Sequence, residues 1–385
     1  MIRYSQQDIT QEDIAAVVDV LKSVNLTQGP NIEYFEQAVL SNVHAKYAVA
    51  VNSATSALHI SCLALDLGPG DWLWTTPNSF VASANCALYC GARVDFVDID
   101  PLSYNISAFA LEAKLIAAEK SGRLPKILVA VHFAGQSCDM QFIQQLAKKY
   151  DFKIIEDASH AIGAKYKLLP IGNCLYADIT VFSFHPVKII TTGEGGMAVT
   201  NSEKIANQLR LLRSHGITRE SSAMTNISHG PWYYEQIELG FNYRMTDIQA
   251  ALGLSQIARL NYYVRRRQEI AKKYDELLSD LPVSLPQQSP DAHSSYHLYV
   301  IRVNLNKIKS THLEVFNYLR KEGILVNLHY IPIHLQPYYQ KMGFKNGDYP
   351  EAEKYYKEAI SIPIYPTIED KELNYVVSVL RKALQ

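Results

Sequence analysis

The sequence is poor in cysteine, and the few cysteines that it has are not spaced as metal ligands. Its 385 residues include five cysteines, an odd number, with no C-x-x-C pair among them. They lie in apolar segments typical of helices and strands, which favours free buried thiols over a disulfide framework or a zinc site. We therefore expect no metal centre.

An excess of charge of either sign is also missing, as is any long apolar run. Lys and Arg number 37 against 38 Asp and Glu, for a formal net charge of −1. This balance gives no electrostatic signal for nucleic acid. The longest apolar stretches, such as 127–133, are too short to span a bilayer, and the first residues contain no apolar signal segment. We expect a cytoplasmic protein that binds neither nucleic acid nor a membrane.

Residues 45–200 alternate between strand-like and helix-like segments. Short β-branched or aromatic runs predict strands at 47–51, 72–75, 93–97, 127–131, 153–156, 179–182 and 197–199. Segments of helical period lie between them, at 55–65, 79–89, 108–118 and 140–150. This order predicts an α/β fold with a mainly parallel sheet covered by helices on both faces. Ligands of such sheets bind beyond the carboxyl ends of the strands.

The pattern changes after a helix-like stretch at 246–278. A proline-punctuated linker follows, and then a smaller α+β pattern with strands at 297–303 and 324–329 and helices at 313–322 and 370–384. We predict a large domain over residues 1–250 and a small C-terminal domain over residues 251–385, which includes the long connecting helix.

The segment 182–196 places a lysine directly after a predicted buried strand. Ser183 and Lys188 follow the strand, and a glycine-rich turn comes next. A lysine in a dry pocket has a lowered pKa and can be stored as an imine, which makes it an effective nucleophile and base. A surface lysine in a loop is the ordinary alternative, and the flanking residues argue against it.

A second segment ends an apolar strand with the carboxylate of Asp157, in Ile154-Ile155-Glu156-Asp157. This position lies at the ligand-bearing edge of the predicted sheet. Taken alone, Asp157 would also suit an N-cap of the following helix. His160, three residues later, is compatible with a ligand contact or with a satisfied histidine of the core.

Two other strands are followed by residues suited to an anion and to a flat ring. Thr55 and Ser56 open a helix, where free backbone N–H groups and the helix dipole favour a phosphate, although such residues also cap helices widely. Phe80 is suited to stack on an aromatic ring or to fill a core. A fourth motif, 240–247, contains Asn242 and ends in two residues typical of helix caps.

Together these four segments resemble one family, the sugar aminotransferases of the DegT/DnrJ/EryC1/StrS type, which share the fold of aspartate aminotransferase. The resemblance covers nearly the whole chain and is most specific over 182–196. It implies an enzyme dependent on pyridoxal 5'-phosphate (PLP), with the type I fold and a seven-stranded sheet. Lys188 would form the Schiff base with PLP, and Asp157 would bind the pyridine nitrogen, which makes the ring an electron sink.

The resemblance also implies the other cofactor contacts. His160 would lie beside the ring, and Phe80 would stack on it. Thr55, Ser56 and Ser183 would surround the phosphate. Asn242 would reach that phosphate from a neighbouring subunit, so that the active unit would be a homodimer with shared active sites.

Within the family, the segments 26–29, 52–58 and 183–188 look most like those of the pseudaminic acid branch. That branch transfers an amino group from L-glutamate to C4 of a UDP-4-keto-6-deoxy-N-acetylhexosamine. Ile189 and Ile190 depart from its pattern, because a proline commonly follows the lysine there. The implied substrate contacts are Tyr4, Val24, Asn25, Leu26, Thr27, Ala54, Ser183, Asn242, Asn327, Leu328, His329 and Tyr330.

Four alternatives remain open from the sequence. Another nucleotide-sugar aminotransferase, of the perosamine or 4-amino-4-deoxy-arabinose type, would share these motifs. A PLP-dependent sugar dehydratase of the same scaffold carries histidine in place of Lys188. An NAD-dependent dehydrogenase would need G-x-G-x-x-G after the first strand, where 52–58 reads Asn-Ser-Ala-Thr-Ser-Ala-Leu. A PLP-binding regulator would need an added DNA-binding module, and the sequence offers none.

Overall fold

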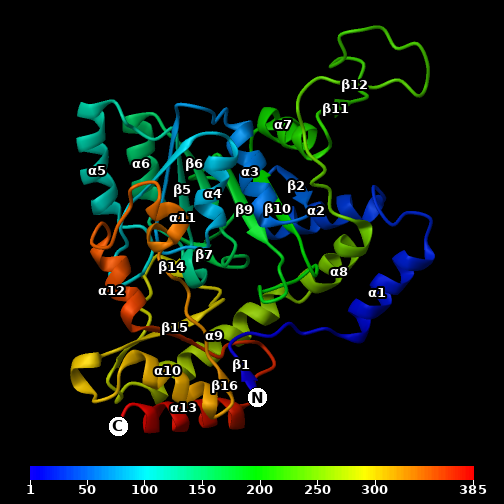
Figure 1. The fold of residues 1–385 in the computed structure, drawn as a ribbon. Helices are drawn as coiled ribbons and strands as arrows, with labels where there is room; N and C mark the ends of the chain where they lie inside the picture. Colours follow the sequence, from blue (N-terminus) through cyan, green and yellow to red (C-terminus); the bar gives the residue numbers. More distant parts are fainter.

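A seven-stranded sheet forms the centre of the computed structural model, which describes residues 1–385 (Figure 1). The order across the sheet is β2-β10-β9-β6-β5-β3-β4. Only β10 runs antiparallel to its neighbours, and the other adjacent pairs are parallel. The predicted mainly parallel sheet is therefore confirmed. Its strands are β2 (Tyr47–Val51), β3 (Trp72–Thr75), β4 (Arg93–Phe96), β5 (Ile127–Val131), β6 (Lys153–Asp157), β9 (Ile179–Ser183) and β10 (Gly196–Thr200).

Helices cover both faces of this sheet, because its strands are apolar on both sides. Alternate residues of each strand point to opposite faces, so that Ile155 and Val181 enter one core and Ile154 and Phe182 another. The first core is covered by α3 (Ala54–Ala64), α4 (Ala82–Tyr89) and α7 (Glu203–Arg213). The second is covered by α2 (Pro30–Val43), α5 (Ala108–Ser121), α6 (Met140–Tyr150) and α8 (Asp247–Ile257).

A third core gathers the C-terminal elements below the main sheet in Figure 1. It joins α9 (Leu260–Leu277), α10 (His312–Lys321) and α13 (Asp370–Ala383) to a small antiparallel sheet of β13 (Val283–Ser284), β15 (Tyr299–Val303) and β17 (Ala359–Ile362). The chain start also belongs here, because β1 (Ile2–Arg3) pairs with β16 (Ile324–Leu325). The domain boundary after residue 250 stays a prediction.

The remaining elements are short or lie at the periphery. None of the helices combines the length and the apolar character that crossing a membrane requires. A hairpin of two short strands projects from the main body beyond α7 (Figure 1). These elements are α1 (Gln11–Lys22), α11 (Pro337–Gln340), α12 (Pro350–Glu358), β7 (Lys165–Tyr166), β8 (Leu169–Pro170), β11 (Ile217–Thr218), β12 (Glu235–Gln236) and β14 (Ala292–His293).

The stretch 246–278, read from sequence as one helix, consists of two helices. Helix α8 ends at Ile257 and α9 begins at Leu260. Between them the guanidinium of Arg259 forms an ion pair of 2.6 Å with the buried carboxylate of Asp13 in α1. This ion pair connects α8 and α9 to the N-terminal helix α1.

The strand predicted at 324–329 is shorter than expected. It ends at Leu325, because its partner β1 supplies only two residues. Asn327 then pairs with Ser361 instead. The residues that follow, His329 and Tyr330, are thereby released from the sheet edge and turn toward the carboxyl ends of the main strands, where Tyr330 N–H donates to the Asn78 side chain at 3.4 Å.

Candidate active site

Two polar residues end neighbouring parallel strands on the same face of the sheet. Asp157 is the last residue of β6 and Ser183 is the last residue of β9. Because each stands two residues after an apolar residue of the α3–α4 core, both side chains point to that face. Asp157 therefore lies at the carboxyl edge of the sheet, as predicted.

Lys188 lies in the loop that joins β9 to β10, and this loop is held by backbone hydrogen bonds. Phe184 N–H donates to Gly195 O, and Lys188 N–H donates to His185 O, both at 2.9 Å. Burial lowers the pKa of the Lys188 amine to about 8, against the opposing effect of the Asp157 carboxylate. About a tenth of the amine is therefore neutral at pH 7, far more than for an exposed lysine.

Both oxygens of the Asp157 carboxylate accept a hydrogen bond from the chain. The Ser83 hydroxyl donates to Oδ2 at 2.6 Å, and the Ser159 N–H donates to Oδ1 at 3.2 Å. The carboxylate is 5% exposed. Its orientation is thus set before any ligand arrives. The contact from Ser83 was missed in the sequence, where nothing distinguishes this serine from an ordinary residue in the first turn of α4.

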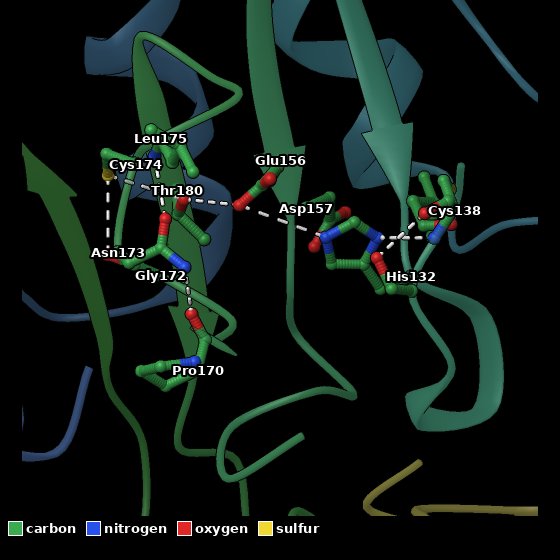
Figure 2. A network of polar contacts seen from close by, with 12 residues as sticks. His132, Cys138, Glu156, Asp157, Pro170, Gly172, Asn173, Cys174, Leu175 and Thr180 are labelled. Atoms are coloured by element: carbon green, nitrogen blue, oxygen red, sulfur yellow. Dashed lines mark hydrogen bonds and ion pairs between the residues drawn. The ribbon is translucent and has the colours of Figure 1, made fainter. Parts of the chain in front are cut away.

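The adjacent carboxylate, Glu156, points to the other face of the sheet. Figure 2 shows it between Thr180 on one side and His132 on the other. Thr180 Oγ1 donates to Glu156 Oε2 at 2.6 Å, and His132 Nε2 lies 3.9 Å from the same oxygen. The Nδ1 of His132 accepts the N–H of Cys138, which places the ring proton on Nε2, toward Glu156. This buried network is separate from the Lys188 side of the sheet.

The protonation state of His160 follows from its two hydrogen bonds. Ala134 N–H donates to Nδ1 at 3.2 Å, so the proton of the neutral ring lies on Nε2 and is donated to the Tyr330 hydroxyl at 3.1 Å. Burial, and then the positive charge of Lys188, hold the pKa of His160 well below its usual value. His160 is therefore a neutral hydrogen-bond donor near the Lys188 amine.

Residues from the C-terminal part of the chain lie next to Lys188. His329 is buried, its Nδ1 lies 2.8 Å from the Ser361 hydroxyl, and its ring packs 5.1 Å from that of Tyr4. Burial and the charge of Lys188 lower the pKa of His329 to about 3. Asn327 and Leu328 precede it and are partly buried. Of the predicted substrate residues, Tyr4, His329 and Tyr330 thus gather around the lysine within one chain.

The N-terminus of α3 lies beside the start of β10. Ser53 caps the helix by accepting the Ser56 N–H, while the Ser56 hydroxyl donates to Asn52 Oδ1 at 2.6 Å. Both donors of Ser56 are therefore engaged within the chain, whereas Thr55, the residue before it, is partly exposed. A Cβ at Gly196 would collide with the backbone of Ser53 and Ala54, so only glycine allows this close approach.

Other predicted site residues are exposed. The Phe80 side chain is 59% exposed, with its ring centre 6.3 Å from that of Tyr330. Asn242 is exposed and pairs with Ser214 at the base of the projecting hairpin. The turn that joins α1 to α2, which lies beside α8 in Figure 1, includes the exposed residues Val24, Asn25, Leu26 and Thr27.

Comparison with known proteins settles the family. The profile of the DegT/DnrJ/EryC1/StrS aminotransferase family matches residues 7–381. This chain belongs to that family. It is similar to the spore coat polysaccharide biosynthesis protein SpsC of Bacillus subtilis, with 39% identity over 98% of this chain and 96% of the relative. It is 38% identical to the UDP-4-amino-4,6-dideoxy-N-acetyl-beta-L-altrosamine transaminase of Campylobacter jejuni, over 100% of this chain and 98% of that protein.

Solved structures of sugar aminotransferases share the whole fold. PseC of Helicobacter pylori, an aminotransferase involved in the biosynthesis of pseudoaminic acid, superposes with a TM-score of 0.90 at 33% identity, covering 100% of this chain and 99% of that one. The PLP-form of the sugar aminotransferase Spr1654 from Streptococcus pneumoniae gives a TM-score of 0.87 at 29% identity, covering 98% and 97%. The protein is therefore a PLP-dependent sugar aminotransferase of the type I fold.

The residues present fit PLP by their chemistry. PLP needs an amine that can condense with an aldehyde, an anion beside a pyridine nitrogen and donors for a phosphate. Lys188 supplies a partly deprotonated amine, Asp157 a buried and oriented carboxylate, and Ser183 with the first turn of α3 the phosphate donors. A wall of aromatic residues, including the exposed face of Phe80, stands beside them.

Proposed function

We propose that this protein transfers an amino group from L-glutamate to C4 of a UDP-4-keto-6-deoxy-N-acetylhexosamine, in pseudaminic acid biosynthesis. The name of the Campylobacter jejuni relative, which matches this chain over its full length, supports this substrate class. So does the likeness to PseC. The observation that carries the transamination itself is the partly buried Lys188 amine beside Asp157, whose pKa of about 8 suits both nucleophile and base.

Lys188 is the group that holds the cofactor and moves the proton. PLP, when bound, supplies an aldehyde for the amine and a ring that accepts electrons from the carbon that loses its proton. When it is not bonded to the cofactor, the neutral Nζ of Lys188 can accept a proton from the α carbon of the amino donor and then donate it to another atom of the reacting molecule.

Asp157, His160 and Phe80 are proposed to hold the ring of the cofactor. The carboxylate of Asp157 would keep a proton on the ring nitrogen, and Ser83 and the Ser159 N–H already orient it for that task. The neutral His160, which is held by the Tyr330 hydroxyl, would lie beside the ring, and the exposed face of Phe80 would offer a stacking surface.

The phosphate is proposed to bind at the N-terminus of α3, together with Ser183. Thr55 has its side chain partly exposed there, whereas the Ser56 hydroxyl must first leave Asn52 in order to donate to a ligand. Free N–H groups in this first turn favour an anion. We therefore expect Thr55 to contribute more to phosphate binding than Ser56.

A second copy of the chain is proposed to complete each site, through Asn242. The projecting hairpin beside Asn242 exposes apolar side chains that a monomer leaves in water, with Ile227 93%, Leu239 77% and Trp232 67% exposed. Large exposed apolar groups clustered in one segment are typical of interaction surfaces. A homodimer would cover the hairpin and supply Asn242 to the partner's site.

The sugar nucleotide is proposed to lie between the sheet edge and the segment 327–330. Tyr4, His329 and Tyr330 line this side within one chain, and Ser183, Ala54, Asn327 and Leu328 adjoin it. The exposed turn with Val24, Asn25, Leu26 and Thr27 is proposed to contact the substrate as well.

Another nucleotide-sugar aminotransferase, of the perosamine or 4-amino-4-deoxy-arabinose type, is the second candidate. The Bacillus subtilis protein SpsC, at 39% identity, has a name that refers to a spore coat polysaccharide, which supports a glycan other than pseudaminic acid as the destination of the product. The two candidates differ in the keto sugar and not in the Lys188 chemistry.

A substrate screen tests the proposal. The PLP-loaded enzyme is incubated with L-glutamate and each of several 4-keto nucleotide sugars, and the products are read by mass spectrometry. We expect amination of the UDP-4-keto-6-deoxy-N-acetylhexosamine. Turnover only with a perosamine or arabinose precursor would replace the proposed substrate by the second candidate, and the absence of 2-oxoglutarate with every sugar would refute the proposal.

A further inference from the structure

We propose that Ser83 is a positioning residue that aims the Asp157 carboxylate at the ring nitrogen of the cofactor, with Ser79 as its own hydrogen-bond donor. The inference rests on the proposed cofactor contact of Asp157. It concerns a short segment, 79–83, that also carries Phe80.

The direction of the hydrogen bonds is fixed by chemistry. An ionised carboxylate only accepts, so the 2.6 Å contact between Ser83 Oγ and Asp157 Oδ2 uses the single proton of the Ser83 hydroxyl. The Ser79 hydroxyl, 2.7 Å from Ser83 Oγ, must then donate to Ser83. The chain Ser79–Ser83–Asp157 therefore ends on the carboxylate with a short, charge-assisted bond.

Burial makes this arrangement rigid. Ser79 is 3% exposed and Ser83 1% exposed, so water does not replace either hydroxyl. Ser159 N–H holds the other oxygen, Oδ1. With one donor on each oxygen, the plane of the carboxylate is fixed, and each oxygen retains a free lone pair for a ligand.

The local backbone explains why one segment serves two purposes. Ser83 N–H donates to Phe80 O at 3.2 Å, and α4 begins only at Ala82. This turn directs Phe80 outward, 59% exposed, and Ser83 inward to Asp157. The segment 79–83 therefore presents an aromatic face for the ring of the cofactor and orients the group that binds its nitrogen.

Pyridoxamine 5'-phosphate isolates this contact, because it cannot form an imine with Lys188. The apo full-length protein is titrated by calorimetry with pyridoxamine 5'-phosphate and with its 1-deaza analogue, in which carbon replaces the ring nitrogen. The dissociation constant of the 1-deaza analogue, divided by that of pyridoxamine 5'-phosphate, measures the contribution of the contact to the ring nitrogen. Phosphate binding and stacking affect both ligands equally.

We expect Ser83→Ala to reduce this ratio about tenfold, as the loss of one hydrogen bond to a charged group does. Ser79→Ala, which leaves the bond from Ser83 in place, should reduce it about threefold or less. The matched control is Ser61→Ala, since Ser61 is a fully buried serine of α3 whose hydroxyl has no partner. It should leave the ratio unchanged.

The outcomes separate this inference from the proposed cofactor site. A wild-type protein that binds both ligands equally would refute the Asp157 contact itself. A wild-type preference that Ser83→Ala retains, or equal weakening of both ligands in Ser83→Ala, would overturn the role of Ser83. Should Ser83→Ala fail to fold in thermal unfolding, Ser83→Cys has nearly the same size and a weaker donor; it must show a reduced ratio, and an unchanged one overturns the inference.

Discussion

Two neighbouring carboxylates of strand β6 show how the face of a sheet decides the use of a residue. Asp157 and Glu156 are equally buried, at 5% and 4% exposure. Asp157 points toward α3 and α4, where Ser83 orients it and the Lys188 amine lies. Glu156 points the other way and binds Thr180 beside His132 (Figure 2). The same chemical group is thus available to a ligand on one face and enclosed in the core on the other.

The largest expected effect is a loss of kcat when Asp157, but not Glu156, is replaced by its amide. Asp157→Asn should lower kcat about 10²- to 10³-fold, because it removes the oriented charge that the ring nitrogen requires. The fold should persist, since the amide oxygen still accepts the short bond from Ser83 and only the longer bond from the Ser159 N–H is lost. Steady-state kinetics with L-glutamate and the keto sugar measure the effect.

Glu156→Gln is the matched control, one residue away. It should leave kcat within about twofold of wild type, because its side chain faces the opposite core. If both variants lost activity equally, the comparison between the two faces would fail.

The next effect is the pH dependence of cofactor capture by the apo protein. Only the neutral amine of Lys188 condenses with PLP, and its pKa of about 8 lies below the usual value for lysine. The rate of capture should therefore rise roughly tenfold per pH unit below pH 8 and level off above it. Stopped-flow absorbance between pH 6 and pH 10 measures this, and a half-point near 10 would show that the amine is not desolvated.

The smallest effect is on stability, and it belongs to Glu156. Glu156→Ala leaves the Thr180 hydroxyl without its acceptor in the core and removes the carboxylate that lies 3.9 Å from His132 Nε2. We expect the free energy of unfolding to fall by about 2 kcal/mol, while the preference for pyridoxamine 5'-phosphate over its 1-deaza analogue stays unchanged. Denaturant titration and calorimetry give the two quantities. A changed ligand preference would show that Glu156 influences binding on the Asp157 face and would contradict the comparison.

The sequence was informative where apolar strands end in polar residues. Lys188, Asp157 and Ser183 were placed correctly at the sheet edge, because strand period and strand ends are both visible in the residues. The break at Arg259 was not visible, and the ion pair found there joins Arg259 to Asp13, which is 246 residues away. The early end of the strand at Leu325 likewise depends on the two-residue length of its partner β1.

Ser83 illustrates the limit at the site itself. A serine in the first turn of a helix is ordinary in sequence, and its importance comes from the bond to Asp157 across the fold. The positions Val24, Asn25, Leu26 and Thr27 stay predictions, because they face solvent within one chain. Asn242 stays a prediction because its proposed site belongs to a second copy of the chain.

Reductive trapping tests the central assignment most directly. The PLP-loaded protein is treated with sodium borohydride, digested and sequenced by mass spectrometry. The account predicts one stable adduct, carried by Lys188, and its loss in Lys188→Ala. An adduct on another lysine of the wild-type protein, or none at all, would contradict it.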